Sequence, residues 1–280
     1  DPDGDRDAGL RHELGRLPGR EPLSVRGRRP GTGLAGDREW MLVDADGLFL
    51  SQRKLPRMAT IRTELRDGRL VLSSQGNGEI VVPKSVGERR PVKIWKSVCD
   101  AFVAEPASEW LQQALATDAN VRLVYFDKRG TRPTDPLRFG PYHTYFSDGA
   151  PYLTANLASL QALNQHLLMT QTAPVDIQRF RPNLVLAGLP PFAEHNYSYL
   201  RPVHGDAALG LRDPCQRCSV ITVDQSTGIA SPTQHPFAAL AELNSMPGKP
   251  KAPAFGVNTV LTEGEGWDVH CGDQWQASLV

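Results

Sequence analysis

Two cysteines separated by two residues are the sharpest chemical feature of the sequence. The run Asp213-Pro214-Cys215-Gln216-Arg217-Cys218 places two thiols beside the guanidinium of Arg217. A neighbouring guanidinium favours the thiolate, which is the form of cysteine that binds a metal or attacks as a nucleophile. Three functional interpretations compete with two ordinary buried cysteines: a structural zinc site, a redox pair, and a single thiolate ligand to a soft transition metal.

The surrounding sequence weakens the first two of these interpretations. A structural zinc site needs four ligands, usually from two pairs, but the other cysteines, Cys99 and Cys271, are isolated. A thioredoxin-like redox pair opens a helix of a βαβ unit, whereas this pair precedes the strand-like run Ser219–Val223. The metal-ligating thiolate and the pair of buried cysteines both stay open from this motif alone.

A second motif is suited to binding an anion. The run Arg179-Phe180-Arg181-Pro182-Asn183 carries two guanidiniums and an amide. Because Pro182 biases Arg181 towards the β region, and side chains alternate along a strand, we expect the two arginines on opposite sides of an extended stretch. A fixed guanidinium followed by an amide suits a phosphate or another polyanion, and a solvated basic edge is the alternative.

A third basic residue, Arg38, stands in Gly36-Asp37-Arg38-Glu39-Trp40, directly before an apolar strand. A surface ion pair with an acidic neighbour is its simplest interpretation. Other familiar patterns are missing from the sequence. The seven histidines show neither HxH nor HExxH spacing, and there is no GxSxG elbow.

Short strands must position these motifs. The 25 glycines and 23 prolines suit strands and turns better than a helical bundle. Turns such as Asp67-Gly68 supply the positive φ angles of a tight hairpin. The expected strands are 40–43, 48–50, 59–65, 70–73, 92–95, 98–103 and 121–126, then 184–186, 207–211, 219–223, 257–261 and 274–279.

Helices are few. Residues 107–116 repeat apolar side chains at helical spacing, and Ser108 can cap them. The best helix covers 156–168, where Asn156 is the cap and four leucines form an apolar stripe that we interpret as core. A third helix lies near 236–243. Residues 128–142 are rich in Pro, Gly and Arg and predict a long, mobile loop.

Composition excludes several classes of protein. Lys plus Arg and Asp plus Glu are both 31, and this zero net charge argues against a nucleic-acid binder. No apolar run approaches the ~18 residues of a membrane-spanning helix, so we expect no membrane partner. The acidic start, Asp1–Asp5, fits neither a signal peptide nor a transit peptide. We therefore expect a cytoplasmic protein that is mainly β with a few helices (α+β). Residues 1–20 would be a poorly ordered leader, or a short helix around Leu10–Leu17.

Together, these motifs resemble the MOSC-domain family, above all its two-part members. That group includes the mitochondrial amidoxime-reducing component and bacterial proteins that confer resistance to N-hydroxylated bases. The matching segments, in order, are 36–43, 52–53, 55–58, 146–149, 158–160, 163–164, 179–185, 214–218, 222–224, 227–228, 255–258 and 272–273. The resemblance implies an N-terminal β-barrel domain over 21–120, packed on a C-terminal MOSC β-barrel over 121–280.

The resemblance also implies a molybdenum cofactor, in which a pterin dithiolene binds the metal and a protein cysteine completes the sulfur ligation. The family's ligand is the second cysteine of the pair, so Cys218 would be both metal ligand and catalytic residue. Arg181 and Asn183 match positions that hold the pterin and its phosphate, and Arg38 matches a phosphate-binding arginine. The full set of implied cofactor-binding residues is Arg181, Asn183, Arg38, Ser24, Asp148 and Arg217.

The resemblance places two of these residues, Asp148 and Ser24, at specific positions of the family's cofactor site. Asp148 falls on a polar cofactor contact at the junction of the domains. Ser24 aligns with the serine of the family's Pro-x-Lys-Ser segment, but the lysine position falls on Leu23. Because a lost charge-assisted hydrogen bond costs ~1.5–3 kcal/mol, we expect this departure to weaken cofactor binding.

By resemblance, the protein would reduce N-hydroxylated compounds such as amidoximes, hydroxylamines and base analogues. With only four cysteines, the chain would take its electrons from a separate ferredoxin-, flavin- or cytochrome-type protein. The alternatives are a non-catalytic molybdenum-cofactor carrier, a sulfur-handling MOSC module, or a relative that has lost the cofactor. In cofactor sulfurases the MOSC domain follows a pyridoxal-phosphate domain, for which 280 residues leave no room.

Overall fold

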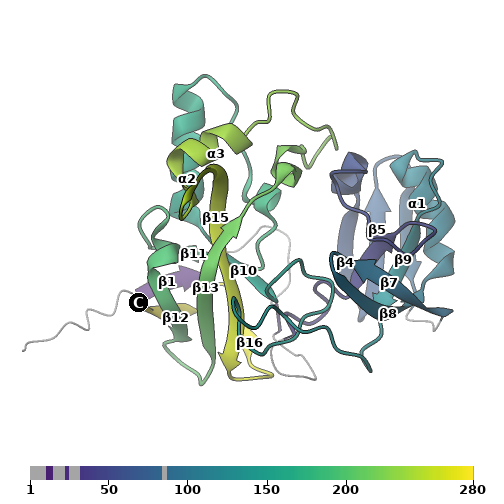
Figure 1. The fold of residues 1–280 in the computed structure, drawn as a ribbon, viewed down its shortest axis with the longest axis horizontal. Coiled ribbons are helices and arrows are strands. Elements are labelled where there is room, and N and C mark those ends of the chain that lie inside the picture. Colours follow the sequence, from purple (N-terminus) through teal and green to yellow (C-terminus); the bar gives the residue numbers. More distant parts are fainter. Residues whose placement is uncertain (1–10, 15–22, 25–31, 84–86, 280) are drawn as a thin grey trace, which may run out of the picture.

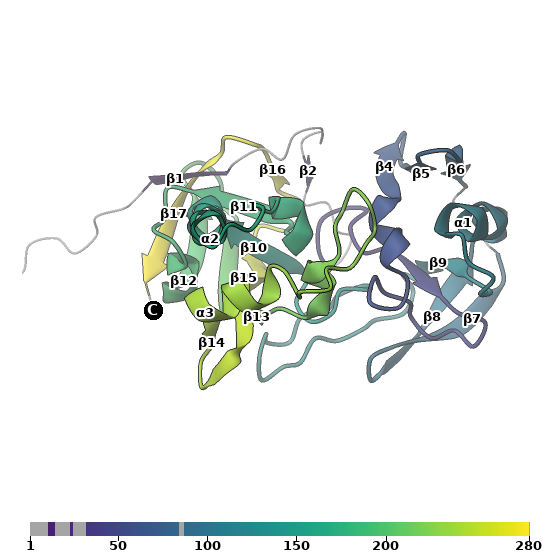
Figure 2. The same cartoon turned by 90° about the horizontal axis from the view of Figure 1, so that it is seen from above.

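The computed structural model describes residues 11–14, 23–24, 32–83 and 87–279, and for the first two of these ranges it describes the backbone alone. Two structural units, here called the first and the second half, lie side by side along the longest axis of the molecule. The first half contains the elements from β3 to β9, and the second half contains those from β10 to β17 together with β1 and β2. In Figure 1 the first half is mostly blue and teal, and the second half is mostly green and yellow. The view from above shows the same separation (Figure 2). The functional motifs of the sequence are divided between these two halves.

Two small sheets and one helix build the first half. One sheet has the strand order β3-β9-β8-β7 and the other the order β4-β5-β6. Apolar side chains cover both faces of the four-stranded sheet. On one face they include Tyr145 and Phe146 from a later loop, and on the other they include Leu72 and Leu111. The elements are β3 (Trp40–Val43), β4 (Arg62–Arg66), β5 (Arg69–Ser74), β6 (Gly78–Val82), β7 (Arg89–Ile94), β8 (Ser97–Val103), α1 (Ser108–Leu115) and β9 (Arg122–Phe126).

One sheet that closes on itself forms the second half. Its order is β10-β11-β1-β17-β12-β13-β15-β14, and a further pairing between β10 and β15 closes the ring. Trp275 is fully buried inside it, among leucines such as Leu186 and Leu200. The strands are β1 (Arg11–Leu14), β10 (Tyr152–Asn156), β11 (Leu184–Ala187), β12 (Tyr197–Pro202), β13 (Ala208–Gln216), β14 (Ser245–Met246), β15 (Lys249–Glu263) and β17 (Gln274–Leu279). A separate pair joins β2 (Leu23–Ser24) to β16 (Asp268–Val269).

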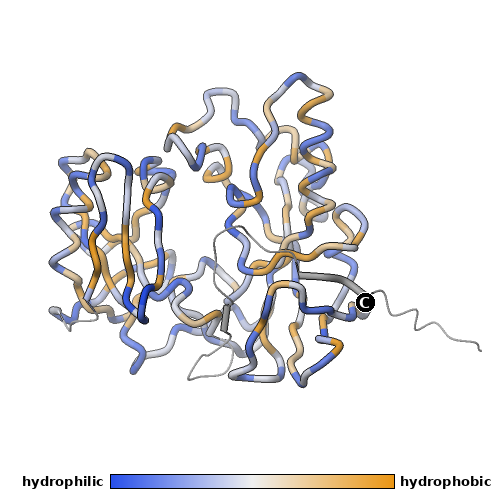
Figure 3. Tube along the Cα trace, turned by 180° about the vertical axis from the view of Figure 1, so that it is seen from behind, coloured by the Kyte–Doolittle hydropathy of each residue, from blue (hydrophilic) through white to orange (hydrophobic). Residues whose placement is uncertain are grey.

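Two helices, α2 (Leu157–Met169) and α3 (Phe237–Leu243), cover this closed sheet on one side (Figures 1 and 2). The Asn156 side chain accepts a hydrogen bond from the backbone N–H of Ala158 and caps α2, as predicted. Leu163 and Leu167 are buried against Phe255 and its neighbours. Figure 3 shows the apolar residues concentrated along the strands of both halves. Short 3₁₀ helices complete the structure: η1 (Pro56–Thr60), η2 (Glu105–Ala107), η3 (Ile177–Phe180), η4 (Ala193–Asn196) and η5 (Ser219–Thr222).

The expected fold class, mainly β with a few helices, is confirmed. The hairpin at Asp67-Gly68 joins β4 to β5, and the strands predicted at 40–43, 92–95, 98–103, 121–126, 184–186 and 274–279 are all present. All three predicted helices form, and 128–142 is a loop without regular strands or helices. No helix formed by the described residues is long and apolar enough to span a membrane.

Several local predictions are wrong. Residues 48–50 form isolated bridges rather than a strand, and η1 occupies the start of the strand expected at 59–65. Ser108 is the first residue of α1, not its cap. Arg11–Leu14 is a strand between β11 and β17, not part of a helix, because the sheet offers two rows of backbone partners there. The rest of the expected leader, 1–10 and 15–20, lies outside the described residues.

Two further corrections concern the functional motifs themselves. Residues 219–223 are not a strand: η5 forms there, with the Thr222 hydroxyl bonded to the Ser219 carbonyl at 2.8 Å. The run 179–183 is not extended either. The Asp176 side chain caps η3 by accepting from the N–H of Gln178, and Arg181 then adopts the left-handed conformation. In both places a side-chain hydrogen bond to the local backbone overrides the strand-like pattern.

The first sheet extends to Phe126 at the end of β9, and the domain boundary expected at residue 120 stays a prediction. The next residue, Asp127, has a side chain that is 2% exposed and accepts from Arg89 at 2.8 Å and from Arg129 at 2.9 Å. The hydrogen bond from Arg129 outweighs burial and lowers the pKa of Asp127 well below its usual range. Asp127 therefore stabilises this end of the sheet as a carboxylate, because it ties the end of β9 to the start of β7.

Replacing Asp127 with alanine should lower the free energy of unfolding at pH 7 by about 1.5–3 kcal/mol, because hydrogen bonds to a charged group are lost. The folded pKa lies below the unfolded value, so this stabilisation is present above about pH 4 and is lost as the pH falls through the folded pKa. Urea unfolding at pH 7 and at pH 2.5 measures the effect. A difference between the two proteins that is undiminished at the lower pH would contradict the ionic explanation.

Candidate functional site

The two halves meet at Arg38 and Arg181. Nη2 of Arg38 donates to the backbone carbonyl of Arg181 at 3.3 Å. Both residues have a positive φ, 53° for Arg38 and 56° for Arg181, which is uncommon for residues other than glycine. Such backbone conformations persist where the surrounding structure holds them, and they cluster at ligand-binding sites. The structure thus brings together two arginines that lie far apart in the sequence.

Positive charge accumulates at this junction. The Arg181 side chain is exposed, yet the charge of Arg38, together with desolvation by neighbouring groups and the charge of Arg217, lowers the pKa of Arg181 to about 10. Asp148 and Asp37 act in the opposite direction without cancelling the repulsion. Guanidiniums that repel one another bind an anion favourably, because the anion relieves the repulsion. The junction therefore has the electrostatics of an anion site.

Asp37 links the halves beside this cluster. Its Oδ1 accepts from Nη1 of Arg38, and its Oδ2 accepts from Nδ2 of Asn183, both at 2.6 Å. Oδ1 of Asn183 accepts in turn from the backbone N–H of Leu153 at 2.8 Å. Asn183 therefore fastens the second half to the first, and its predicted contact with a cofactor stays a prediction. The sequence motif around Arg38 contains Asp37, but nothing in the sequence indicated its bond to Asn183.

The cysteine motif lies where β13 leaves the sheet. Cys218 is exposed and directly precedes η5, whereas Cys215 is partly buried. Nη1 of Arg217 lies 3.1 Å from Sγ of Cys215, and Nη2 donates to the backbone carbonyl of Phe180 at 2.8 Å. The guanidinium expected beside a thiol therefore contacts Cys215, and the accessible thiol is that of Cys218.

Arg217 connects the cysteine motif to the arginine motif. Through the carbonyl of Phe180 it reaches the residue that precedes Arg181, and Phe180 itself stacks on Phe255 with ring centroids 3.8 Å apart. Nε of Arg217 is buried and has no hydrogen-bond partner in the part of the chain that the structure describes. A buried N–H without a partner is costly, so it marks a place where a ligand acceptor would be stabilising.

Arg179 has a different role from the one predicted. It is buried, and its Nη2 donates to Oδ2 of Asp224 at 3.0 Å. The Ser226 hydroxyl, which donates to Oδ1 of Asp224 at 2.6 Å, is the main reason why the pKa of Asp224 lies well below its usual range. Arg179 thus ties η3 to the loop after η5, and of the two arginines only Arg181 reaches the cationic cluster.

Asp148 lies on the loop that crosses between the halves. Its Oδ1 accepts from Nε1 of Trp95, in the first half, at 2.9 Å. Buried Arg132 holds this loop by donating from Nη1 to the backbone carbonyls of Tyr145 and Ser147. Sequence reasoning missed Arg132, because an arginine in a Pro- and Gly-rich loop looks like solvated surface.

The donor set suits one thiolate-bound metal beside an anion. Within the described ranges, no group of three or more His, Cys, Asp or Glu side chains is arranged to hold a metal ion. A metal bound by the exposed thiol of Cys218 would take its other ligands from a bound group, and an anionic part of that group would fit the arginines. Of Ser24 the structure describes only the backbone, which pairs with Asp268, so its predicted role stays a prediction.

Comparisons with known proteins agree with these observations. A family model described as the MOSC N-terminal beta barrel domain matches residues 23–118, and the model of the MOSC domain matches residues 141–276. The molybdenum cofactor sulfurase of Danio rerio is 30% identical over 236 residues, which cover 76% of this chain and 27% of that protein. The sulfurase of Drosophila grimshawi is 29% identical over 210 residues, 71% of this chain and 26% of that protein.

Mitochondrial amidoxime-reducing component 1 of Mus musculus is 27% identical over 202 residues, 69% of this chain and 57% of that protein. The chain therefore spans about a quarter of the sulfurases that it matches, and somewhat more than half of the amidoxime-reducing component. The names of the sulfurases refer to the molybdenum cofactor, whereas the name of the mouse protein refers to amidoxime reduction.

Proposed function

This chain belongs to the MOSC-domain family, and from that premise we propose that it binds a molybdenum cofactor at the junction of its halves and reduces N-hydroxylated compounds. The observation that carries the proposal is the convergence of Arg38, Arg181 and Arg217 at the junction, and in the sequence Arg217 directly precedes Cys218, whose thiol is exposed. An anion site and a soft-metal ligand are the two things that such a cofactor requires of a protein.

Each residue of the site has a distinct task in this proposal. Cys218 ligates the metal through its thiolate, and Arg38 and Arg181 hold the phosphate from the two sides of the junction. Arg217 keeps the cysteine motif beside Phe180 by donating a hydrogen bond to the Phe180 carbonyl. Its buried Nε, which has no partner among the described residues, can donate to the bound group. When bound, the cofactor supplies a redox-active metal that can remove oxygen from nitrogen.

Asp37 and the remaining predicted residues complete the binding surface. Asn183 and Asp37 set the spacing of the halves, so that Arg38 and Arg181 face the same anion. Asp148 is held at the edge of the junction by Trp95 and offers a polar contact to the cofactor. Ser24, whose backbone pairs with β16, is the last cofactor-binding residue that the family resemblance implies.

The likeness to amidoxime-reducing components, at 27% identity, supports amidoximes, hydroxylamines and related base analogues as the substrate class. Electrons would come from a separate ferredoxin-, flavin- or cytochrome-type protein. The direct test uses protein expressed in a host that makes the cofactor, with reduced methyl viologen as the electron donor and benzamidoxime as the substrate. Formation of benzamidine in proportion to the molybdenum content is expected, and protein that contains molybdenum but forms no benzamidine would contradict the reductase assignment.

A second candidate function is favoured by the sulfurase relatives, which are as similar to this chain as the amidoxime-reducing components are. In that case the domain would bind the cofactor while sulfur is added to it, and it would reduce no substrate. Bound molybdenum without benzamidoxime reduction is the expected result for this candidate, so the same assay separates the two functions.

A further inference from the structure

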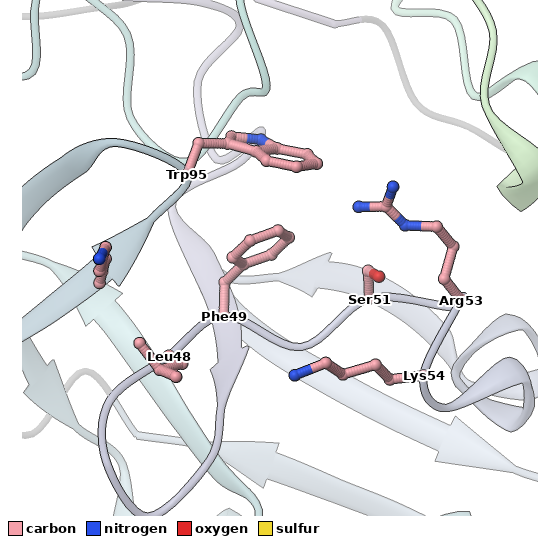
Figure 4. A pocket seen from close by; sticks show the side chains of 7 residues that line it. Leu48, Phe49, Ser51, Arg53, Lys54 and Trp95 are labelled. Carbon is pink, nitrogen blue, oxygen red and sulfur yellow. The ribbon is translucent and has the colours of Figure 1, made fainter.

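A pocket on the first half is unexplained by the site at the junction. It has a volume of about 400 Å³, within the range of roughly 300–1,000 Å³ that is usual for small-molecule sites. Two aromatic residues, Phe49 and Trp95, line it together with Ser51 and three cations, Arg53, Lys54 and Lys93 (Figure 4). None of the lining residues is acidic.

The aromatic side of the pocket is fixed in place. The rings of Phe49 and Trp95 lie 4.8 Å apart between centroids, at an interplanar angle of 50°. Trp95 stands in the tight turn between β7 and β8 with a positive φ of 52°, and its Nε1 is bonded to Asp148. Even so, Trp95 is left 44% exposed. An oriented, solvent-exposed indole is a ready stacking surface for a planar ring.

The opposite side of the pocket is cationic. Arg53 and Lys54 come from one loop, and Figure 4 shows their side chains extending across the pocket towards Trp95 and Phe49. The Arg53 guanidinium lies 5.0 Å from the centroid of the Trp95 ring. All three cations are exposed, and none forms an ion pair with another described residue. An anion would therefore meet positive charge without displacing a carboxylate of the protein.

We propose that this pocket binds a planar aromatic anion, such as an aromatic carboxylate or phosphate. The ring stacks against Phe49 and Trp95, and the acidic group lies between Arg53 and Lys54, with the Ser51 hydroxyl within the same pocket. Because Trp95 is bonded to Asp148, the pocket adjoins the junction. A consequence for catalysis rests on the proposed function: the pocket would select N-hydroxylated substrates that carry an aromatic acid.

Isothermal titration calorimetry of cofactor-free protein tests the binding. The probes are 2-naphthoate and its neutral counterpart 2-naphthamide. We expect naphthoate to bind at least tenfold more tightly than the amide. Arg53→Gln and Lys54→Gln should each weaken naphthoate binding about tenfold and leave amide binding unchanged, because each removes one charge-assisted contact. Phe49→Leu should weaken the binding of both probes.

Lys96→Gln is the matched control, since Lys96 is an exposed lysine that follows Trp95 but does not line the pocket. Its affinity for naphthoate should equal that of the wild type. No binding of naphthoate, equal affinities for the two probes, or an equal loss in Lys96→Gln would overturn the proposal. If the protein bound an acidic protein but not naphthoate, the three cations of the pocket would belong to a protein interface. That result would also overturn the proposal. Because no cofactor is present, these outcomes are independent of the reductase assay.

Discussion

Cys218→Ser should abolish molybdenum retention and leave the fold intact. A hydroxyl is a poor ligand for a soft metal, so the largest contribution of the protein to metal binding is lost. Cys218 is exposed at the start of η5, so the exchange creates no cavity, and the free energy of unfolding of the cofactor-free protein should change by less than about 0.5 kcal/mol. Molybdenum per chain is measured by mass spectrometry after expression in a cofactor-competent host, and stability by urea unfolding.

Cys215→Ser is the matched control, because it changes the same atom three residues away. Cys215 is partly buried and lies against Arg217, and serine can still accept a hydrogen bond from that guanidinium. The Cys215→Ser protein should keep most of its molybdenum. Equal loss from both variants would contradict a single-thiolate ligand and would favour a site that both thiols share.

Arg181→Ala should weaken cofactor retention by about one to two orders of magnitude. The variant loses charge-assisted hydrogen bonds to the phosphate, each worth ~1.5–3 kcal/mol. Arg181→Lys should recover only part of the loss, since the ammonium group of lysine does not form the paired hydrogen bonds that a planar guanidinium forms with a phosphate. Both replacements keep a Cβ atom, so the positive φ of 56° affects them equally, and the difference between them reports on the charged group. Cofactor dissociation during dialysis measures the effect.

The thermal stability of the cofactor-free Arg181→Ala protein provides a second measurement. The replacement weakens cofactor retention, but it should not weaken the empty fold. Repulsion from Arg38 lowers the pKa of Arg181 to about 10 in the folded protein, below the unfolded value. The charged side chain therefore disfavours the empty fold at neutral pH, and its removal should leave thermal stability equal or higher. Arg201→Ala, which removes an arginine paired with Glu263 far along the sheet, should retain the cofactor normally. Normal retention by Arg181→Ala would show that Arg181 is only a surface residue.

Local patterns were sufficient to predict much of the fold. The Asp67-Gly68 turn fixes its hairpin through backbone conformation, and Asn156 caps α2 through its own side chain. These features depend on residues that are close in sequence. The position of β1 could not be predicted in this way, because Arg11–Leu14 forms a strand only through partners more than a hundred residues later.

The candidate site shows the same division. Residue types in the cysteine and arginine motifs indicated a thiolate and an anion site, and the structure brings Arg38, Arg181 and Arg217 together. The bond between Asp37 and Asn183 joins residues from different halves, so no local signal could reveal it. The strand predicted for 179–183 was wrong because hydrogen bonding by Asp176 competes with the extended conformation.

The molybdenum and pterin content of the purified wild-type protein tests most directly whether the junction holds a molybdenum cofactor. Protein from a host that makes the cofactor should contain molybdenum and pterin in equal molar amounts, and protein from a host that cannot make it should contain neither. Equal amounts are expected even if the Leu23 position lowers the occupancy, because the metal and the pterin bind as one group. Protein that is folded but free of both after expression in the competent host, and that acquires neither when incubated with isolated cofactor, would contradict the account.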